Sequence, residues 1–174
     1  MDTGSLIFVT GGARSGKSRY AQELALQLSD APVYVATARH WDDDFEKRIQ
    51  RHRNDRDERW TGVEEEKYIS RLNLAAKVVV VDCVTLWLTN FFVDSRQDID
   101  ACLDACKREI DALKTRTTTY IIISNELGMG MHADTETGRK FTDLQGWMNQ
   151  YIAAKADKVV FMVSGIPLII KQAV

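Results

Sequence analysis

Short apolar segments rich in β-branched residues alternate along this chain with longer segments whose apolar side chains fall at helical spacing. Apolar runs of this kind are typical of buried strands, and a helical period is typical of helices that cover a sheet. The alternation predicts an α/β fold in which helices flank a mostly parallel sheet. Strands are expected at 6–9, 32–36, 78–82, 120–124 and 159–163.

The periodic segments between these runs predict the helices of the fold. Long helices are expected at 18–28, 42–53, 85–93, 99–113 and 138–155, and a short one at 68–74. After the last predicted strand, the chain turns at 164–167 into a short tail, 168–171. The 85–93 segment is more apolar than one buried helix face requires, which indicates packing against the sheet or against a partner subunit.

The first predicted strand, the loop after it and the next helix match the phosphate-binding P-loop, G-x-x-x-x-G-K-S/T. Glycines in this motif let the backbone approach phosphate oxygens, while amide groups and the positive end of the helix face the anion. The chain is therefore predicted to be a P-loop NTPase-type domain that binds a nucleoside triphosphate. The binding residues are Gly11, Gly12, Ala13, Arg14, Ser15, Gly16, Lys17 and Ser18.

Three side chains are predicted to contact the phosphates and their cation. Lys17 would reach the β- and γ-phosphates, and the Ser18 hydroxyl would bind Mg²⁺. Asp82 closes the apolar run 78–82 like the acid of a Walker B strand, and would hold the same Mg²⁺ directly or through water. The alternative role for Asp82 is an acidic cap on the next helix.

Length, charge and cysteine content narrow the class of protein. A chain of 174 residues fits a single domain, 1–174. The net charge of −2 gives no electrostatic reason to expect a nucleic-acid or membrane partner, and no apolar run approaches the ~20 residues that span a bilayer. Cys83, Cys102 and Cys106 are too few for a disulfide framework, so a reduced, cytoplasmic protein with buried thiols is expected. Cys102 and Cys106 share a helix face, which leaves a redox or metal role open.

One histidine stands in an arginine-rich setting. In the helix predicted at 42–53, the apolar positions end in His52. Around it lie Arg48, Arg51, Arg53, Arg56 and Arg59. Such arginines suit phosphate oxygens, although nearby acids can pair with some of them. His52 can accordingly be a packed core or interface group, a general base, an orienting group or a nucleophile, and the pattern alone does not choose among these roles.

Four motifs carry a resemblance to a known family. They are Gly-Gly-Ala-Arg-Ser-Gly-Lys-Ser-Arg at 11–19, Arg48-Ile49-x-x-His52-x-x-x-Arg56-x-x-x-Trp60-x-x-x-Glu64, Asn125-Glu126-x-Gly128-x-Gly130, and Ala153-x-x-Ala156-Asp157-x-Val159 ahead of Ser164-Gly165-Ile166-Pro167. In this order, the chain resembles the bifunctional adenosylcobinamide kinase/adenosylcobinamide-phosphate guanylyltransferase family of cobalamin synthesis, over about residues 6–171. The P-loop is generic, and the histidine and Asn-Glu motifs are more specific.

The resemblance implies two reactions. The family phosphorylates the aminopropanol hydroxyl of adenosylcobinamide with ATP or GTP, and then transfers GMP from GTP to adenosylcobinamide phosphate through a guanylylated histidine. That histidine falls on His52, so His52 and Lys17 are the expected catalytic residues, while Arg56, Glu64 and Asp82 join the P-loop in nucleotide binding. Mg²⁺ is the expected cofactor, and the resemblance implies a homo-oligomer, a trimer. His132, which follows the Asn-Glu motif, is a second candidate nucleophile.

Two other interpretations have their own discriminating features. The first is a small-molecule kinase that uses the P-loop and keeps His52 as a structural residue; GTP would then leave no covalent label on the protein. The second is a non-catalytic nucleotide-binding switch or regulatory subunit. The absence of the guanine-reading N-K-x-D motif and the presence of the arginine-histidine segment count against a switch.

Overall fold

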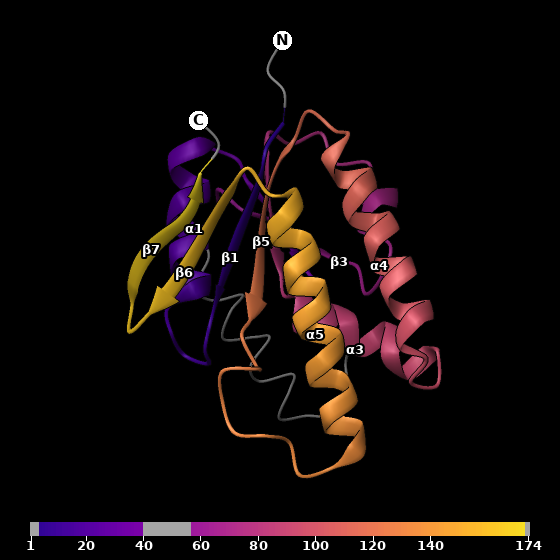
Figure 1. The fold of residues 1–174 in the computed structure, drawn as a ribbon. Coiled ribbons are helices and arrows are strands. Elements are labelled where there is room, and N and C mark those ends of the chain that lie inside the picture. The colour runs from indigo at the N-terminus through magenta and orange to yellow at the C-terminus, as the bar shows by residue number, and fades with distance from the viewer. Residues whose placement is uncertain (1–3, 40–56, 173–174) are drawn as a thin grey trace.

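The computed structural model describes residues 4–39 and 57–172, which form one mixed sheet flanked by helices (Figure 1). Within these residues the seven strands lie in the order β3-β2-β4-β5-β1-β6-β7, and all pairs are parallel except β6 with β7. The strands are β1 (Leu6–Gly11), β2 (Val33–Ala36), β3 (Thr61–Glu64), β4 (Val78–Asp82), β5 (Thr119–Asn125), β6 (Lys158–Val163) and β7 (Ile166–Gln172).

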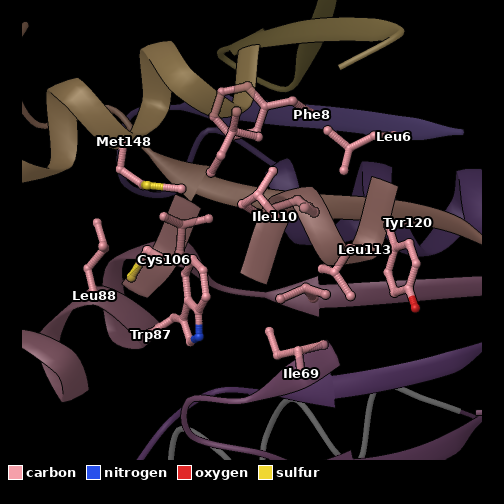
Figure 2. Close-up of a cluster of buried hydrophobic side chains, with 14 of the residues drawn as sticks. Leu6, Phe8, Ile69, Trp87, Leu88, Cys106, Ile110, Leu113, Tyr120 and Met148 are labelled. Carbon is pink, nitrogen blue, oxygen red and sulfur yellow. The ribbon is translucent and has the colours of Figure 1, made fainter. Parts of the chain in front are cut away.

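Helices cover both faces of this sheet. One face packs against α1 (Lys17–Leu28), and the other packs against α3 (Val84–Asp94), α4 (Ile99–Lys114) and α5 (Glu136–Lys155). Figure 2 shows how the second layer is filled: Trp87 and Leu88 of α3, Ile110 of α4 and Met148 of α5 gather over Phe8 of β1. Apolar burial on both faces explains why the central strands read as continuous apolar runs.

The α/β class and the five predicted strands are confirmed, as are the four long helices whose residues are described. The helix expected at 42–53 lies outside the described residues. The prediction of a short helix at 68–74 is wrong, because only a single 3₁₀ turn, η1 (Ile69–Arg71), forms there. Ser70 donates from both its amide and its hydroxyl to the Glu109 carboxylate of α4, so side-chain contacts rather than helical hydrogen bonds hold this segment.

The apolar segment expected at 85–93 packs within its own subunit. Trp87, Leu88, Phe91 and Phe92 are all buried against the sheet and the neighbouring helices. The indole of Trp87 donates to the Lys67 carbonyl at 2.7 Å, which satisfies its one polar group. The high apolar content of α3 therefore reflects burial on most sides of the helix, and its described contacts supply no subunit interface.

The C-terminal segment expected as a tail instead forms β7, which pairs antiparallel with β6. Ser164 and Gly165 connect the two strands with φ values of 50° and 81°, the left-handed conformations that a two-residue hairpin turn requires. The strand leaves an aliphatic surface exposed at the edge of the sheet: Ile166, Leu168, Ile169 and Ile170, next to Val163 of β6. We call these five residues the β7 edge. None of the helices in the described part of the chain is long and apolar enough to cross a membrane.

Candidate active site

The P-loop connects the carboxyl end of β1 to the first turn of α1, at the lower edge of the sheet in Figure 1. Gly16 occupies the N-cap position with φ 93° and ψ 11°, and no side chain caps the helix there. By contrast, Asp98 caps α4 and Thr135 caps α5 with side-chain hydrogen bonds. The amide groups of the first turn of α1 therefore point to an anion rather than to a capping side chain.

Two neighbouring loops fix the P-loop in place. The amide of Glu126, which follows β5, donates to the Gly11 carbonyl at 2.9 Å. The amide of Gly165, in the β6–β7 turn, donates to the Ser15 carbonyl at 2.9 Å. The phosphate-binding loop is thus held from both sides by segments that come from much later in the chain.

The glycine at the start of the loop is required by close packing. A Cβ at Gly11 would lie 2.5 Å from the Met162 carbonyl oxygen and 2.8 Å from Ser15 Oγ. We expect Gly11→Ala to lower the free energy of unfolding by about 1–3 kcal/mol, as overpacked sites do. Gly12→Ala is the matched control, because no atom lies within 4 Å of its added Cβ. Urea unfolding of both variants tests this, and equal losses would contradict it.

Lys17 is folded back onto the loop that carries it. Its side chain is buried, and Nζ donates to the Gly12 carbonyl at 2.6 Å and lies 3.5 Å from Ser15 Oγ. Burial lowers the pKa of Lys17 from its ordinary value, although the nearby Cys83 and Asp82 oppose the shift. A charge in this position is held at an energetic cost that phosphate oxygens would offset.

Ser18, Asp82 and Tyr34 meet beside this lysine. The Ser18 hydroxyl donates to Asp82 Oδ2 at 3.1 Å, and the Tyr34 phenol donates to the same oxygen. Asp82 comes from the carboxyl end of β4, and Tyr34 comes from the adjacent β2. The structure therefore brings together Ser18 and Asp82, as the motif predicts, and adds Tyr34, which sequence reasoning missed.

The Ser18–Asp82 pair fits a magnesium ion. Hydroxyl and carboxylate oxygens are ligands that Mg²⁺ accepts, and this ion commonly binds one or two protein oxygens together with substrate phosphates and water. The described residues contain no cluster of three or more histidine, cysteine, aspartate or glutamate side chains that could hold a metal ion. Phosphate oxygens would therefore complete the coordination of a cation at this site.

The remaining predicted nucleotide-binding residues have different standings. Glu64 ends β3, and its register partner Ala36 also pairs with Asp82, so the two carboxylate-bearing residues lie at the same level of the sheet. They are separated by two strand spacings, about 10 Å. His52 and Arg56 lie outside the described residues, so their roles stay predictions.

A buried polar network supports the loop after β5. Ser124 donates to Asn149 Oδ1 at 2.6 Å, Gln145 Nε2 donates to both, and Asn149 Nδ2 donates to the Asn125 carbonyl at 3.1 Å. Asn125 in turn donates to Thr85 Oγ1 at 3.0 Å. The Asn-Glu motif thus starts from a rigid base, and the loop beyond it exposes Met129, Met131 and His132 next to the P-loop edge of the sheet.

The cysteines are buried, as expected. Cys83, Cys102 and Cys106 are free thiols, and burial raises the pKa of Cys83 to about 12. Burial also raises the pKa of Cys102 and of Cys106. Thiols in this state are poor nucleophiles and poor metal ligands, which favours a packing role over a redox or metal role.

Solved structures with a similar fold include a flagellar accessory protein and an ATPase domain. The flagellar accessory protein FlaH from Methanocaldococcus jannaschii superposes with a TM-score of 0.53 at 18% identity, covering 99% of this chain and 80% of that one. The ATPase domain superposes with a TM-score of 0.51 at 12% identity, covering 92% of this chain and 70% of that one. At these identities the likeness concerns the fold alone.

Sequence relatives are more informative. The bifunctional adenosylcobalamin biosynthesis protein CobP of Pseudomonas aeruginosa is 37% identical over 94% of this chain and 95% of its own length. The corresponding CobU proteins of Escherichia coli and Salmonella typhimurium are 37% and 35% identical, each over 95% of this chain and 99% of their own length. The family described as cobinamide kinase / cobinamide phosphate guanyltransferase matches residues 7–170. With the P-loop, Lys17, Ser18 and Asp82 assembled as such an enzyme requires, the chain belongs to this family of bifunctional kinases and guanylyltransferases.

Proposed function

We propose that this protein phosphorylates adenosylcobinamide with ATP or GTP, and then transfers GMP from GTP to adenosylcobinamide phosphate, giving adenosyl-GDP-cobinamide for cobalamin synthesis. The observation that carries this proposal is the convergence of Lys17, Ser18 and Asp82 on one P-loop in a chain of this family. Both reactions need a triphosphate held in a fixed orientation, and this arrangement is suited to that task.

In the kinase step, the aminopropanol hydroxyl of adenosylcobinamide attacks the γ-phosphorus of ATP or GTP. The bond from that phosphorus to the β–γ bridging oxygen breaks, the nucleoside diphosphate leaves, and the hydroxyl proton passes to solvent. The residues at 11–16 hold the phosphates through backbone amides, and Lys17 neutralises charge that develops on the leaving oxygen.

In the transferase step, the neutral imidazole of His52 attacks the α-phosphorus of GTP and expels pyrophosphate, which leaves a histidine–GMP phosphoramidate. A phosphate oxygen of adenosylcobinamide phosphate then attacks the same phosphorus, releases His52 and forms the diphosphate of adenosyl-GDP-cobinamide. Lys17 and neighbouring arginines stabilise the pyrophosphate. We assign nucleotide binding to Arg56 and Glu64 as part of the same proposal.

Magnesium is included in the proposal as the cofactor of both steps. Ser18 and Asp82 would hold the ion, which supplies charge neutralisation at the phosphates when bound. Their 3.1 Å hydrogen bond places two suitable oxygens side by side. We also propose a cytoplasmic location, since three buried free thiols suit a reducing compartment.

The experiment that tests the function uses the wild-type chain with Mg²⁺ and GTP radiolabelled at the α-phosphorus. The expected result is a covalent label on denaturing gels that is labile to acid and stable to base, together with conversion of adenosylcobinamide to its phosphate and then to adenosyl-GDP-cobinamide. Phosphorylation of adenosylcobinamide without any label would favour the plain kinase. Nucleotide binding without turnover of either kind would favour a regulatory protein.

We further propose a homo-oligomer, in agreement with the trimer expected for the family, and place its interface at the β7 edge. The aliphatic side chains there are about half exposed or more, from 48% for Val163 to 69% for Ile166, which is unusual for an isolated surface. Because Leu168 and Ile170 share one strand face, Leu168→Lys with Ile170→Lys is expected to shift the protein to monomer in sedimentation velocity. Leu28→Lys, at an exposed leucine of α1, is the control and should leave the assembly unchanged.

A further inference from the structure

We propose that Tyr34 is a positioning residue of the magnesium–nucleotide site, and that its phenol holds the Asp82 carboxylate in the orientation that binds the cation. This inference rests on the nucleotide-binding part of the proposed function and assigns a role to a residue outside the P-loop motifs. Three observations carry it: the reach of Tyr34 across the sheet, the shared carboxylate oxygen, and the packing that keeps the ring in place.

The sheet register explains how a residue of β2 reaches Asp82. Tyr34 pairs with Val80, while Asp82 pairs with Ala36, two residues further along both strands. Side chains alternate in strands, so Tyr34, Val80 and Asp82 lie on the same sheet face, the one that packs against α1. Two residues correspond to about 6.6 Å along a strand, a distance that a tyrosine side chain spans.

The hydrogen bonds leave the two oxygens of Asp82 in different environments. Oδ2 accepts from Ser18 Oγ at 3.1 Å and also from the Tyr34 phenol. Among the described residues, Oδ1 accepts no hydrogen bond from a side chain or amide. Two donors on one oxygen fix the rotation of the carboxylate about its last bond, which leaves the lone pairs of the other oxygen for a cation or its water.

Packing makes Tyr34 a rigid support. The residue is 3% exposed, and its ring meets that of Trp60 edge to face, with centroids 6.0 Å apart and an angle of 79° between the planes. A buried phenol that cannot turn away holds its acceptor at one place. Outer partners of this kind fix the geometry of a metal ligand and tune its affinity without touching the metal.

The test is Tyr34→Phe, which keeps the ring and removes only the hydroxyl. Isothermal titration with GDP, in Mg²⁺ and separately in EDTA, gives the affinity of each form, and a Mg²⁺ titration of the GDP complex gives the affinity for the ion. We expect Mg²⁺ affinity to fall about 10-fold or more, the usual cost of losing an outer partner of a metal ligand. GDP affinity in EDTA should stay within about threefold, because the Tyr34 hydroxyl donates to Asp82 and not to the P-loop backbone.

Tyr151→Phe is the matched control. The Tyr151 hydroxyl also donates to a carboxylate, that of Asp111, but it lies on α5, away from the P-loop. Its loss should leave both GDP affinities and the Mg²⁺ titration unchanged.

A structural role for Tyr34 predicts a different pattern. The unfolding temperature of Tyr34→Phe would fall while Mg²⁺ affinity stayed the same, and that result would overturn the proposal. Failure of wild-type GDP binding to respond to Mg²⁺ would overturn it as well. A wild type that binds Mg²⁺ and GDP tightly but never becomes guanylylated would instead contradict the transferase step and leave the role of Tyr34 standing.

If Tyr34→Phe does not fold, the same titrations on Ser18→Ala supply the second measurement. Ser18 and Tyr34 donate to one oxygen, so removal of Ser18 should lower Mg²⁺ affinity in the same direction and leave Tyr34 as the remaining donor. Adding Tyr34→Leu to Ser18→Ala should then lower Mg²⁺ affinity further. No further loss in the double variant would contradict a positioning role.

Discussion

Lys17→Met should abolish productive nucleotide binding and leave the nucleotide-free protein as stable as the wild type, or more stable. The charged head of Lys17 is buried, and burial holds its pKa below the ordinary value. A base with a lowered pKa in the folded state makes folding less favourable at neutral pH, and that cost disappears as pH rises through the pKa of the unfolded chain. Methionine keeps the apolar stem and removes the charge.

The functional loss should be large because Lys17 acts on charge that develops during both reactions. Removal of one preorganised donor commonly lowers kcat about 10²–10³-fold. In thermal unfolding, GTP with Mg²⁺ should raise the melting temperature of the wild type and not that of Lys17→Met.

Lys155→Met is the control for Lys17→Met, because it removes an exposed lysine that pairs with Asp111 at 2.8 Å. Such pairs contribute about 0–1 kcal/mol, so its stability and its response to GTP should stay close to wild type. A Lys17→Met protein that is strongly destabilised and still responds to GTP would contradict the assignment.

His52→Ala should remove the covalent GMP label and the transferase activity while the kinase activity remains. Loss of a nucleophile in a covalent mechanism can lower the rate by on the order of 10⁴-fold or more, whereas the kinase step uses Lys17, Ser18 and Asp82 and needs no covalent intermediate. The measurements are protein-bound label from GTP radiolabelled at the α-phosphorus, and separate assays of adenosylcobinamide phosphate and adenosyl-GDP-cobinamide.

His132→Ala is the matched control, because His132 is the other histidine considered as a nucleophile and lies exposed in the loop after β5. It should retain the label. Label that persists in His52→Ala and disappears in His132→Ala would move the nucleophile to His132. Simultaneous loss of kinase and transferase activity in His52→Ala would show that His52 supports nucleotide binding rather than covalent transfer.

The part of the fold that sequence reasoning predicted is the part where burial leaves a local signature. β4 and β5 are covered on both faces, so each reads as an unbroken apolar run. β3 has only one partly buried apolar side chain, Val63, and its formation depends on pairing with β2. β7 contains Pro167 and is exposed along its whole length; the proline is tolerated because the strand is at the edge.

The candidate site shows the same division. Lys17, Ser18 and Asp82 were predictable because a P-loop and a strand that ends in an acid have fixed chemical roles. The role of Tyr34 was not, because it depends on β2 lying beside β4 with a particular register, and sequence pattern does not specify the order of strands in a parallel sheet. The position of a functional side chain within the chain can be read earlier than the neighbours that orient it.

The position of β1 between β5 and β6 has a consequence for how the protein is made. The ribosome releases the P-loop residues first, but the partners of β1 and the Gly165 amide that binds Ser15 come from the last third of the chain. Contacts so distant in sequence form late in folding. The nascent chain therefore cannot bind nucleotide until its synthesis is nearly complete, and GTP can assist only the final stage of folding, when β6 and its turn join the sheet.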